Sequence, residues 1–444
     1  MCKREHYDSN MRDSVSLEER GQLLGGPYAY KPEELVVVSQ HLSLVLEELE
    51  AAGVAVDTKA IRHSSILDLD LVPLIDVDDA AKKLIASVVD PKSDPPERSL
   101  EQVLWALRQI TAYQYAGWFP SIGKNRTVGM IHGVGEVSHG GGGYPEPISA
   151  KEEFNVPARA LGPGRGVRIG VLDSALYPQP WLAGGWSAGY SDTVDRSKRA
   201  RYSDGHATFV TGLILSQAPG ATVDVHCVLE HDGKADSWDV AEEIVRFGQS
   251  GLDILNLSFV CYTEDGQPPL VLSTAVDRLP PDLVVVAAAG NHGEVQDPEP
   301  KSESEPTPKD QARKAGWPAA LDDVIAVGAV VDATKKEAEL APFSPNAPWV
   351  DVLAPGVDLK STFLPSACVE DDMEAEPMDF PDCWAIWSGT SFAAGLVSGA
   401  IAAAADPGRR SARSAAQDLF AALERSDAPR IGNTRAKVLN VPTF

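Results

Sequence analysis

Five short segments beyond residue 160 consist almost wholly of apolar residues and alternate with stretches of helical pattern. These segments are Val167–Leu172, Thr222–Val228, Ile254–Leu257, Leu283–Ala289 and Val324–Val330. Strands so uniformly apolar are buried on both faces, which is typical of a parallel sheet that helices cover on both sides. The sequence therefore predicts an α/β fold with a mostly parallel sheet. Active sites in such folds lie beyond the carboxyl ends of the strands.

Four polar residues lie at the ends of these predicted elements. Asp173 follows the strand Val-Arg-Ile-Gly-Val-Leu, and Asn291 closes the run Val-Val-Val-Ala-Ala-Ala-Gly-Asn. His206 lies in a glycine turn that leads into a helix of small residues. Ser391 lies in the run Gly-Thr-Ser-Phe-Ala-Ala, where an apolar helix is expected from Phe392 through Ala405. Each of the four, taken alone, also has an ordinary explanation as a helix cap or a turn residue.

Taken together, the four residues support a catalytic hypothesis. A serine hydroxyl is a poor nucleophile until a base removes its proton, and the base needs an acid to orient it. Ser391 at a helix start would meet free backbone N–H groups and the positive end of the helix dipole, which suit a developing anion. An asparagine amide can donate to the same anion. The chain supplies an acid, a base, a donor and a nucleophile in the order Asp173, His206, Asn291, Ser391.

The local strings around these residues resemble the subtilisin-like serine proteases (subtilases), of an intracellular bacterial type with a non-standard N-terminal domain. Val-Leu-Asp-Ser resembles the acid motif, Gly-His-Ala-Thr-Phe-Val-Thr-Gly the histidine motif, and Gly-Thr-Ser-Phe-Ala-Ala-Gly the serine motif. Ala-Ala-Ala-Gly-Asn resembles the oxyanion motif, and Ile254–Ser258 resembles the strand that pairs with substrate. The resemblance covers about residues 165–425.

The resemblance implies a three-layer sandwich and a serine endopeptidase that acts on polypeptides, with a catalytic triad of Asp173, His206 and Ser391. It implies an oxyanion donor at Asn291. It also implies a substrate-binding surface made of Leu257, Ser258, Phe259, Ala289 and Gly290. No calcium site of the family can be carried over residue by residue, so we expect neither a metal nor a cofactor.

The chain departs from the family pattern in two motifs. Ala207 and Phe209 stand where the family usually has a glycine and often a second histidine. Phe259, Val260 and Cys261 occupy a region that usually holds glycines, so we expect reshaped pockets and restricted specificity. The same departures motivate an alternative function, that of a catalytically weak protease-fold protein that binds peptides or a partner.

The net charge of −25 argues against nucleic acid or an anionic membrane as a standing partner. Residues 294–310 carry six acids and two lysines, and residues 369–382 carry seven acids and no base. They belong to expected insertions at 293–315 and 364–385, next to Asn291 and Ser391 in the sequence. These acidic loops are either simply solvated or they steer a basic substrate or partner to the site.

Cysteine usage and the N-terminus favour a cytoplasmic protein. Five cysteines with no dense spacing do not make a disulfide framework. Cys368 and Cys383 flank the acidic stretch, where they either pair in an oxidising setting or remain free thiols. The polar first residues are not those of a signal peptide, and no apolar run is long enough to span a bilayer.

Glycine-rich residues 140–143 and 162–166 mark the best domain boundary. We expect a disordered N-terminus at 1–27, an α+β domain at 28–150, and the catalytic domain at 151–444. In the α+β domain we expect helices at Pro32–Gly53, Asp78–Val89 and Ser99–Tyr115, the last with a capping box, and strands at Val54–Val56, Ile66–Ile75 and Thr127–His132.

The function of the N-terminal domain has two readings. Subtilases are usually secreted and made with a pro-domain that assists folding and blocks the cleft, yet residues 28–135 do not match the common pro-domain pattern. This domain is either regulatory, with Val134–Gly143 reaching toward the cleft, or a packing module that binds a protein partner.

Overall fold

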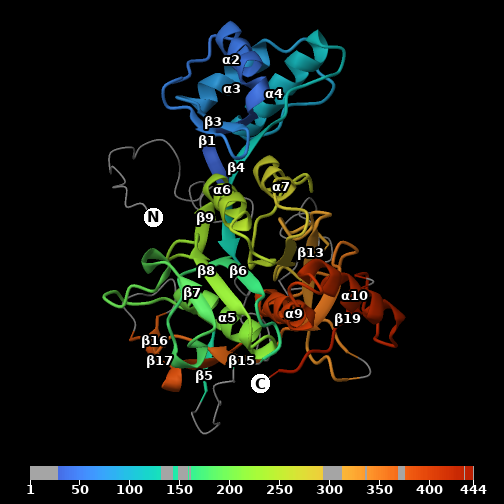
Figure 1. Cartoon of the computed structure of the whole chain (residues 1–444). Helices are drawn as coiled ribbons and strands as arrows, with labels where there is room; N and C mark the ends of the chain where they lie inside the picture. The colour runs from blue at the N-terminus through green and yellow to red at the C-terminus, as the bar shows by residue number, and fades with distance from the viewer. Residues whose placement is uncertain are drawn as a thin grey trace.

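The computed structural model describes residues 29–131, 144–148, 159, 162–293, 313–335, 338–368, 376–434 and 436–443. The N-terminus at 1–27, the segment Val134–Gly143 and most of the first acidic insertion lie outside the described residues. A small N-terminal lobe stands on a larger lobe that holds the remaining residues (Figure 1).

The larger lobe is built on an eight-stranded sheet whose order is β19-β14-β13-β12-β10-β6-β8-β7. All of its strand pairs are parallel. Its strands are β6 Arg168–Asp173, β7 Trp186–Ala188, β8 Thr222–Cys227, β10 Ile254–Leu257, β12 Val284–Ala288, β13 Val324–Val330, β14 Val352–Pro355 and β19 Lys437–Val438. The predicted parallel α/β sheet is confirmed, and the expected bounds of β10 and β13 are the observed ones.

Helices cover both faces of this sheet, which makes three layers. Along β12, Val284, Val286 and Ala288 join one apolar core, which also holds side chains of α5 His206–Gln217, α9 Thr390–Ala404 and α10 Ala412–Arg425. Val285 and Ala287 join the other core, together with α6 Ser237–Gly248 and α7 Leu270–Asp277. Successive side chains of a strand point to opposite faces, so an uninterrupted apolar strand can supply both cores.

Two short antiparallel sheets are built from strands that precede α9, the helix that contains Ser391, in the sequence. One joins β15 Leu359–Thr362, β18 Trp384–Trp387 and β5 Glu146–Pro147, and the other joins β16 Ser366–Ala367 to β17 Met378–Asp379. Cys368 and Cys383 do not form a disulfide in this arrangement.

The N-terminal lobe combines antiparallel strands with three α-helices. Its elements are β1 Tyr30–Val38, the 3₁₀ helix η1 Ser39–His41, α2 Leu42–Ala51, β2 Arg62–Ser64, β3 Leu69–Pro73, α3 Val77–Ala86, α4 Ser99–Gln114 and β4 Ile122–Met130. The sheet order is β11-β4-β1-β3-β2, with β9 Lys234–Asp236 also pairing with β4. Both β9 and β11 Phe259–Val260 belong to the larger lobe, so one sheet runs across the two lobes.

Three expectations for this lobe are wrong or incomplete. The helix expected at Pro32–Gly53 is a strand up to Val38, because Leu35 and Val37 pack into one core while Val36 packs into another, a spacing of two that suits a strand. The strand expected at Ile66–Ile75 begins only at Leu69, after a turn, and Val56 makes a single bridge to Leu74.

The capping box expected at Ser99 does not form. Arg98 is the N-cap of α4, and the Ser99 hydroxyl donates to Asp78 at the start of α3. The Gln102 amide turns to the carbonyl of Pro96. The helix itself is present, and its first turn is held by contacts with α3 and the preceding loop.

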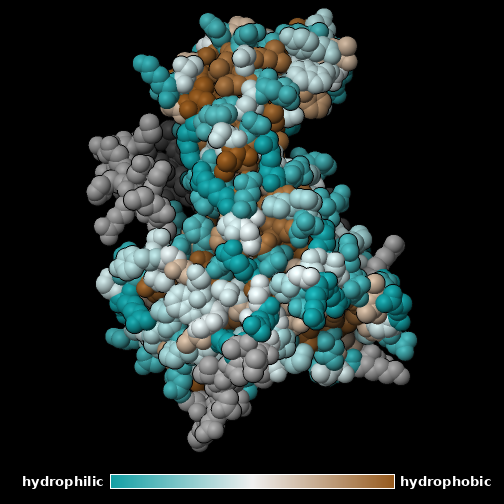
Figure 2. All heavy atoms as spheres, in the orientation of Figure 1, coloured by the Kyte–Doolittle hydropathy of each residue, from teal (hydrophilic) through white to brown (hydrophobic). Residues whose placement is uncertain are grey.

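Figure 2 shows a surface on which hydrophobic side chains gather mainly on the N-terminal lobe, while the visible face of the larger lobe is mostly hydrophilic. Within the described residues, every helix is too short or too polar to cross a membrane. The same residues contain no group of three or more His, Cys, Asp or Glu side chains placed to hold a metal ion.

Candidate active site

Asp173 and His206 lie in direct contact. Asp173 is the last residue of β6 and His206 is the first residue of α5. The His206 Nδ1 lies 2.8 Å and 2.9 Å from the two carboxylate oxygens of Asp173. Both residues are almost fully buried, with 0% and 1% of their surfaces exposed. A carboxylate bound to Nδ1–H fixes the imidazole tautomer and leaves Nε2 free to accept a proton.

The Nε2 atom of His206 is buried and makes no hydrogen bond to any described residue. Buried polar atoms are seldom left without a partner, and those that are often have a functional role. Aromatic rings surround this imidazole, with the Trp387 and Phe392 ring centroids 5.6 Å and 5.4 Å away. Since Phe392 directly follows Ser391 in α9, the starts of α5 and α9 meet at this point.

Ser391 is the second residue of α9 and is 1% exposed. Its hydroxyl donates to the carbonyl of Ser258 over 3.5 Å. The structure therefore brings Ser391 into the same buried region as His206 without a hydrogen bond between them. Nucleophile–base hydrogen bonds are often long in a resting site and tighten when substrate binds.

Asn291 lies at the start of the serine helix. Its Oδ1 accepts hydrogen bonds from the backbone N–H and the hydroxyl of Thr390, each over 3.0 Å. Its Nδ2 is buried and has no partner among the described residues. The two donors from Thr390 fix the orientation of the amide. The free N–H₂ group is consequently a donor available to a negatively charged oxygen beside Ser391.

The residues expected to bind substrate form two neighbouring segments. Leu257 ends β10, Ser258 follows it, and Phe259 begins β11. Ala289 and Gly290 directly follow the adjacent strand β12. Ala289 donates its N–H to the carbonyl of Val327, and Gly290 donates its N–H to the Thr390 hydroxyl. Gly290 has φ +107° and a Cβ there would lie 2.7 Å from the His292 ring, so this position requires glycine.

Strand β4 of the N-terminal lobe pairs with two strands of the larger lobe, β11 and β9. Gly129 and Met130 pair antiparallel with Val260 and Phe259 of β11. On its other edge, residues Thr127–Gly129 pair antiparallel with β9. Figure 1 shows β4 descending from the N-terminal lobe toward α6 and α7. The edge of β11 expected to bind a substrate backbone is thus occupied by the chain's own backbone.

Asn125 of β4 caps a helix of the other lobe. Its Oδ1 accepts hydrogen bonds from the Ser237 hydroxyl and the Trp238 N–H, both over 3.0 Å, at the first two residues of α6. The Ser237 hydroxyl in turn accepts the Arg126 N–H over 2.8 Å. The first N–H groups of a helix need partners outside the helix, so this contact joins the lobes through α6.

Arg126 and Lys124 converge on Glu264 of the larger lobe. The Arg126 guanidinium donates to Glu264 over 3.0 Å and to the carbonyl of Tyr262 over 3.2 Å. The Lys124 Nζ lies 3.6 Å from Glu264. Burial raises the pKa of Glu264, but Arg126 and Lys124 outweigh that effect and hold the pKa below its usual value. We call Lys124, Asn125, Arg126, Ser237 and Glu264 the joint.

Sequence reasoning missed the joint. Asn125 and Arg126 lie in a run of polar residues from Lys124 to Thr127 of β4, and their partners lie 111 to 138 positions away in the chain. Only the register of β4 against β9 and β11 brings them together. A signal was present in the polar pair Asn-Arg within a half-apolar segment, since buried polar residues need partners.

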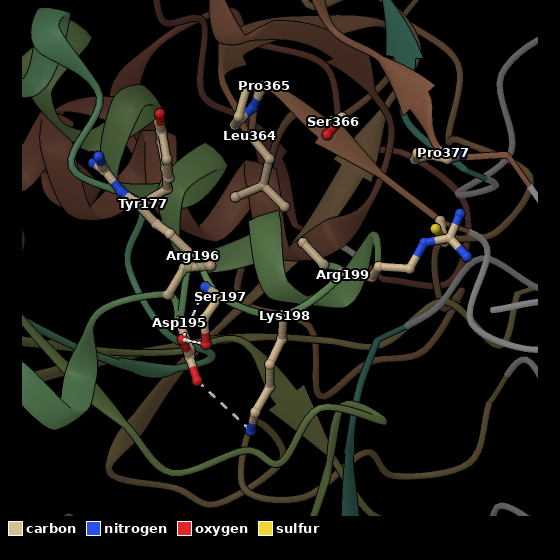
Figure 3. Close-up of a pocket in the computed structure, with 13 residues that line it drawn as sticks. Tyr177, Asp195, Arg196, Ser197, Lys198, Arg199, Leu364, Pro365, Ser366 and Pro377 are labelled. Carbon is tan, nitrogen blue, oxygen red and sulfur yellow. Dashed lines mark hydrogen bonds and ion pairs between the residues drawn. The ribbon is translucent and has the colours of Figure 1, made fainter.

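A cavity of 420 Å³ lies between the loop 194–200 and residues near β16, with three basic side chains, Arg196, Lys198 and Arg199, around it (Figure 3). The Arg196 guanidinium lies 4.9 Å from the ring centroid of Tyr177. Cys368 and Pro377, at the two ends of residues 369–376, also line the cavity. Cys368 precedes the second acidic stretch in the sequence and Pro377 belongs to it, so both of these described residues lie at a pocket that also has three basic side chains.

The family model described as the subtilase family matches residues 164–424, which is more than half of the chain. The Thermophilic serine proteinase of Bacillus sp. (strain AK1) is 30% identical over 255 residues, which cover 55% of this chain and 53% of that protein. Subtilisin DY of Bacillus licheniformis is 32% identical over 217 residues, which cover 45% of this chain and 68% of that protein.

Among solved structures, fervidolysin from Fervidobacterium pennivorans, described as a keratinolytic enzyme related to subtilisin, matches with a TM-score of 0.53 and 18% identity. The match covers 90% of this chain and 58% of that one, and it concerns the fold. The chain spans about half the length of the first relative and of this structural neighbour.

Proposed function

Because the chain belongs to the subtilase family, we propose that it is a serine endopeptidase whose N-terminal lobe regulates it. Asp173, His206 and Ser391 form the triad in this proposal, and Asn291 is the oxyanion donor. The observation that carries it is the contact of His206 Nδ1 with Asp173, which leaves a buried, unpartnered Nε2 beside the serine helix.

Each group has a distinct role in the proposed reaction. The His206 Nε2 takes the proton of Ser391 as the serine oxygen attacks a peptide carbonyl. Asp173 holds the imidazole through Nδ1 and stabilises the cation that forms. The carbonyl oxygen becomes negatively charged and accepts hydrogen bonds from the Asn291 Nδ2 and from the Ser391 N–H. The proton then passes from His206 to the leaving amine as the C–N bond breaks, which leaves an ester on Ser391. His206 next takes a proton from a water molecule that attacks this ester, and returns the proton to Ser391 as the acid product leaves.

A serine-directed fluorophosphonate tests this function on the full chain. We expect covalent labelling of Ser391, found by peptide mapping, and its loss in Ser391→Ala. The rate of labelling should fall at least about 10³-fold in His206→Ala, since the serine is then not activated. A wild-type chain that resists labelling and peptide hydrolysis, before and after release of the N-terminal lobe, would favour the peptide-binding alternative.

We propose that β4 acts as an internal competitor of substrate. An extended peptide binds such a sheet edge through main-chain hydrogen bonds. Since β4 pairs with β11 through Gly129 and Met130, a substrate backbone cannot pair there at the same time. This contact supports the regulatory reading of the N-terminal lobe over the reading as a packing module.

The register also indicates where the chain would cut itself. Continued by one residue, the pairing of Met130 with Phe259 sets Ile131 opposite Ser258, whose carbonyl accepts the Ser391 hydroxyl. We expect cleavage after Ile131 when the full chain is incubated, detected by mass spectrometry of the two fragments. Ser391→Ala should stay intact. Cleavage that persists in Ser391→Ala would come from another protease and would count against this proposal.

Restricted specificity is supported by tight packing beside β11. A Cβ at Gly316 would lie 2.7 Å from the carbonyl oxygen of Ala289 and 3.0 Å from the Val260 side chain. Gly316 therefore packs against both Ala289 and Val260, and the Val260 side chain narrows the space between the two predicted substrate-binding segments. A peptide library should show hydrolysis of a small set of sequences, and Val260→Gly should broaden that set.

We propose that the protein works in the cytoplasm. An odd number of cysteines, of which the four described ones form no disulfide, supports a reducing compartment. Cell fractionation with an antibody to the catalytic lobe tests this, and recovery from the medium would contradict it.

A further inference from the structure

His292 directly follows the proposed oxyanion donor, and both of its ring nitrogens are engaged. The Tyr262 hydroxyl lies 2.8 Å from Nδ1. The Nε2 lies 2.9 Å from the carbonyl oxygen of Lys314. A carbonyl can only accept a hydrogen bond, so Nε2 carries the proton and Nδ1 accepts from the tyrosine. The imidazole therefore joins two segments that are far apart in the sequence.

Aromatic rings enclose this imidazole. The Tyr262 ring meets it edge-on with centroids 4.6 Å apart, and the Trp349 ring lies parallel to it at 6.5 Å. The Trp349 indole donates to the carbonyl of Arg313, next to Lys314. Burial lowers the pKa of His292 to about 4, so the ring is neutral at physiological pH. A neutral ring is the form that can both accept from Tyr262 and donate to Lys314.

The loop that carries Asn291 is held on its other side by the serine helix. The Thr390 hydroxyl and N–H bind Gly290 and Asn291, as described above for the amide. The Gly293 N–H donates to the carbonyl of Phe343. These bonds fix the two ends of the turn, whereas the His292 side chain ties its middle to Tyr262, which follows the substrate-pairing strand.

We propose that His292 is a positioning residue that fixes the Asn291 amide for oxyanion binding, with Tyr262 and the Lys314 carbonyl holding its ring. This inference rests on the proposed endopeptidase function. A donor works best when it already points to where charge develops, because no reorganisation is then needed during the reaction. His292 touches neither the substrate nor the reacting atoms in this role, and acts only through Asn291.

A double-mutant cycle tests the inference on the full chain. Hydrolysis of a fluorogenic peptide is measured for wild type, Asn291→Ala, His292→Ala and the double variant, with rates normalised to the Ser391 that reacts with fluorophosphonate. We expect His292→Ala to lower kcat by about 10-fold to 100-fold with KM changed less than about threefold, since the interaction is used mainly in the transition state. The double variant should be no slower than Asn291→Ala, because the two residues act as a unit.

Three milder variants separate positioning from folding. Tyr262→Phe removes one hydroxyl and should lower kcat by about threefold to tenfold. His292→Asn keeps an acceptor near the place of Nδ1, and His292→Gln keeps a donor near the place of Nε2. At least one of these two should restore kcat above that of His292→Ala. Thermal unfolding of each variant records any loss of stability separately.

The outcomes divide cleanly. Losses of Asn291→Ala and His292→Ala that multiply in the double variant would overturn the inference, as would a normal kcat in His292→Ala with a lowered unfolding temperature. Full activity of Ser391→Ala would instead defeat the proposed function itself. An inactive Ser391→Ala combined with a multiplicative cycle would remove only the role of His292.

Discussion

The candidate active site is buried, as are Asn125, Arg126 and Ser237 of the joint, yet the polar atoms of the two places differ in their hydrogen bonding. At the active site, His206 Nε2 and Asn291 Nδ2 have no hydrogen-bond partner among the described residues. At the joint, the Asn125 amide has partners on both of its polar atoms, and Arg126 binds Tyr262 and Glu264. Unpaired buried groups cost stability, and paired ones hold segments together.

The candidate active site therefore has unpaired groups that a ligand could bind, whereas the groups of the joint already have their hydrogen-bond partners. In the proposed reaction, the unpaired acceptor on His206 takes the serine proton and the unpaired donor on Asn291 binds the carbonyl oxygen. The polar groups of the joint are satisfied because residues of β4 bind residues of the larger lobe within the same chain. Substitutions at the active site should therefore abolish peptide hydrolysis, whereas substitutions at the joint should increase it.

The largest expected effect is at the active site. Ser391→Ala and His206→Ala should each lower kcat by about 10⁴-fold or more, since triad members act as a unit. Hydrolysis of a fluorogenic peptide by the full chain measures this loss. Ser388→Ala is the matched control, because that hydroxyl accepts from the Asp358 N–H and donates to the Asp358 carboxylate, and the change should cost less than about twofold. Full activity in His206→Ala would disprove the triad assignment.

The joint should respond in the opposite direction. Arg126→Ala removes a guanidinium that is only 7% exposed and leaves Glu264, which is 37% exposed, without its closest cation. We expect hydrolysis by the full chain to rise by about tenfold, equal to about 1.4 kcal/mol of weaker β4 docking. Thermal unfolding should show a lower midpoint in a Ser391→Ala background, where self-cleavage is absent.

Arg62→Ala is the control for the joint. Its guanidinium also reaches across the lobes, to Asp239 of α6, but both side chains are more than half exposed. Exposed ion pairs contribute little, so activity should change less than about twofold. Equal activation by both variants would mean that general weakening of the lobe contact, and not the joint, controls access to Ser391.

The smallest effect on activity is expected for a polar contact within the larger lobe, which acts on stability instead. His226 lies between Asp192 and Glu243, at 3.1 Å from each, and side-chain hydrogen bonds to both carboxylates raise its pKa to about 9 from 6.5. A raised folded-state pKa means that this stabilisation is complete below pH 6.5 and is lost as the pH rises through 9. We expect a loss on the order of 2 kcal/mol, allowing for partial exposure.

Unfolding of Ser391→Ala between pH 6 and about pH 9.5 measures this loss, and His226→Gln in the same background should flatten it. A slope that remains in His226→Gln would assign the effect to other groups. This contact is paired like the joint, but it joins elements of one lobe and should leave peptide hydrolysis at pH 7 unchanged.

The sequence predicted the larger lobe far better than the smaller one. Strands such as β10 and β13 are almost wholly apolar and are buried on both faces, and such runs in alternation with helical stretches favour a parallel sheet. In the N-terminal lobe, Glu33 to Leu46 mixes apolar and polar residues at spacings that fit a helix or a strand. Only tertiary contacts decide there, since Val36 packs against the other lobe.

The proposed site residues were chosen from strand ends and helix starts, and the fold brings Asp173, His206, Asn291 and Ser391 to such places. The pairing of β4 with β9 and β11 was not predictable in the same way. The strand expected at Thr127–His132 begins earlier, at Ile122, and ends at Met130, and nothing in its residues indicates that β9 and β11 are its partners. Strand pairing depends on register over long loops, which local patterns do not encode.

The proposed self-inhibition should be insensitive to dilution, because a peptide link joins β4 to the catalytic lobe. A tethered strand meets the edge of β11 at an effective concentration of about a millimolar or more, whatever the protein concentration of the solution. Activity per molecule should then be the same at any protein level while the chain is whole. One break after Ile131 would convert β4 into a separate inhibitor, whose hold weakens as the two pieces become scarce.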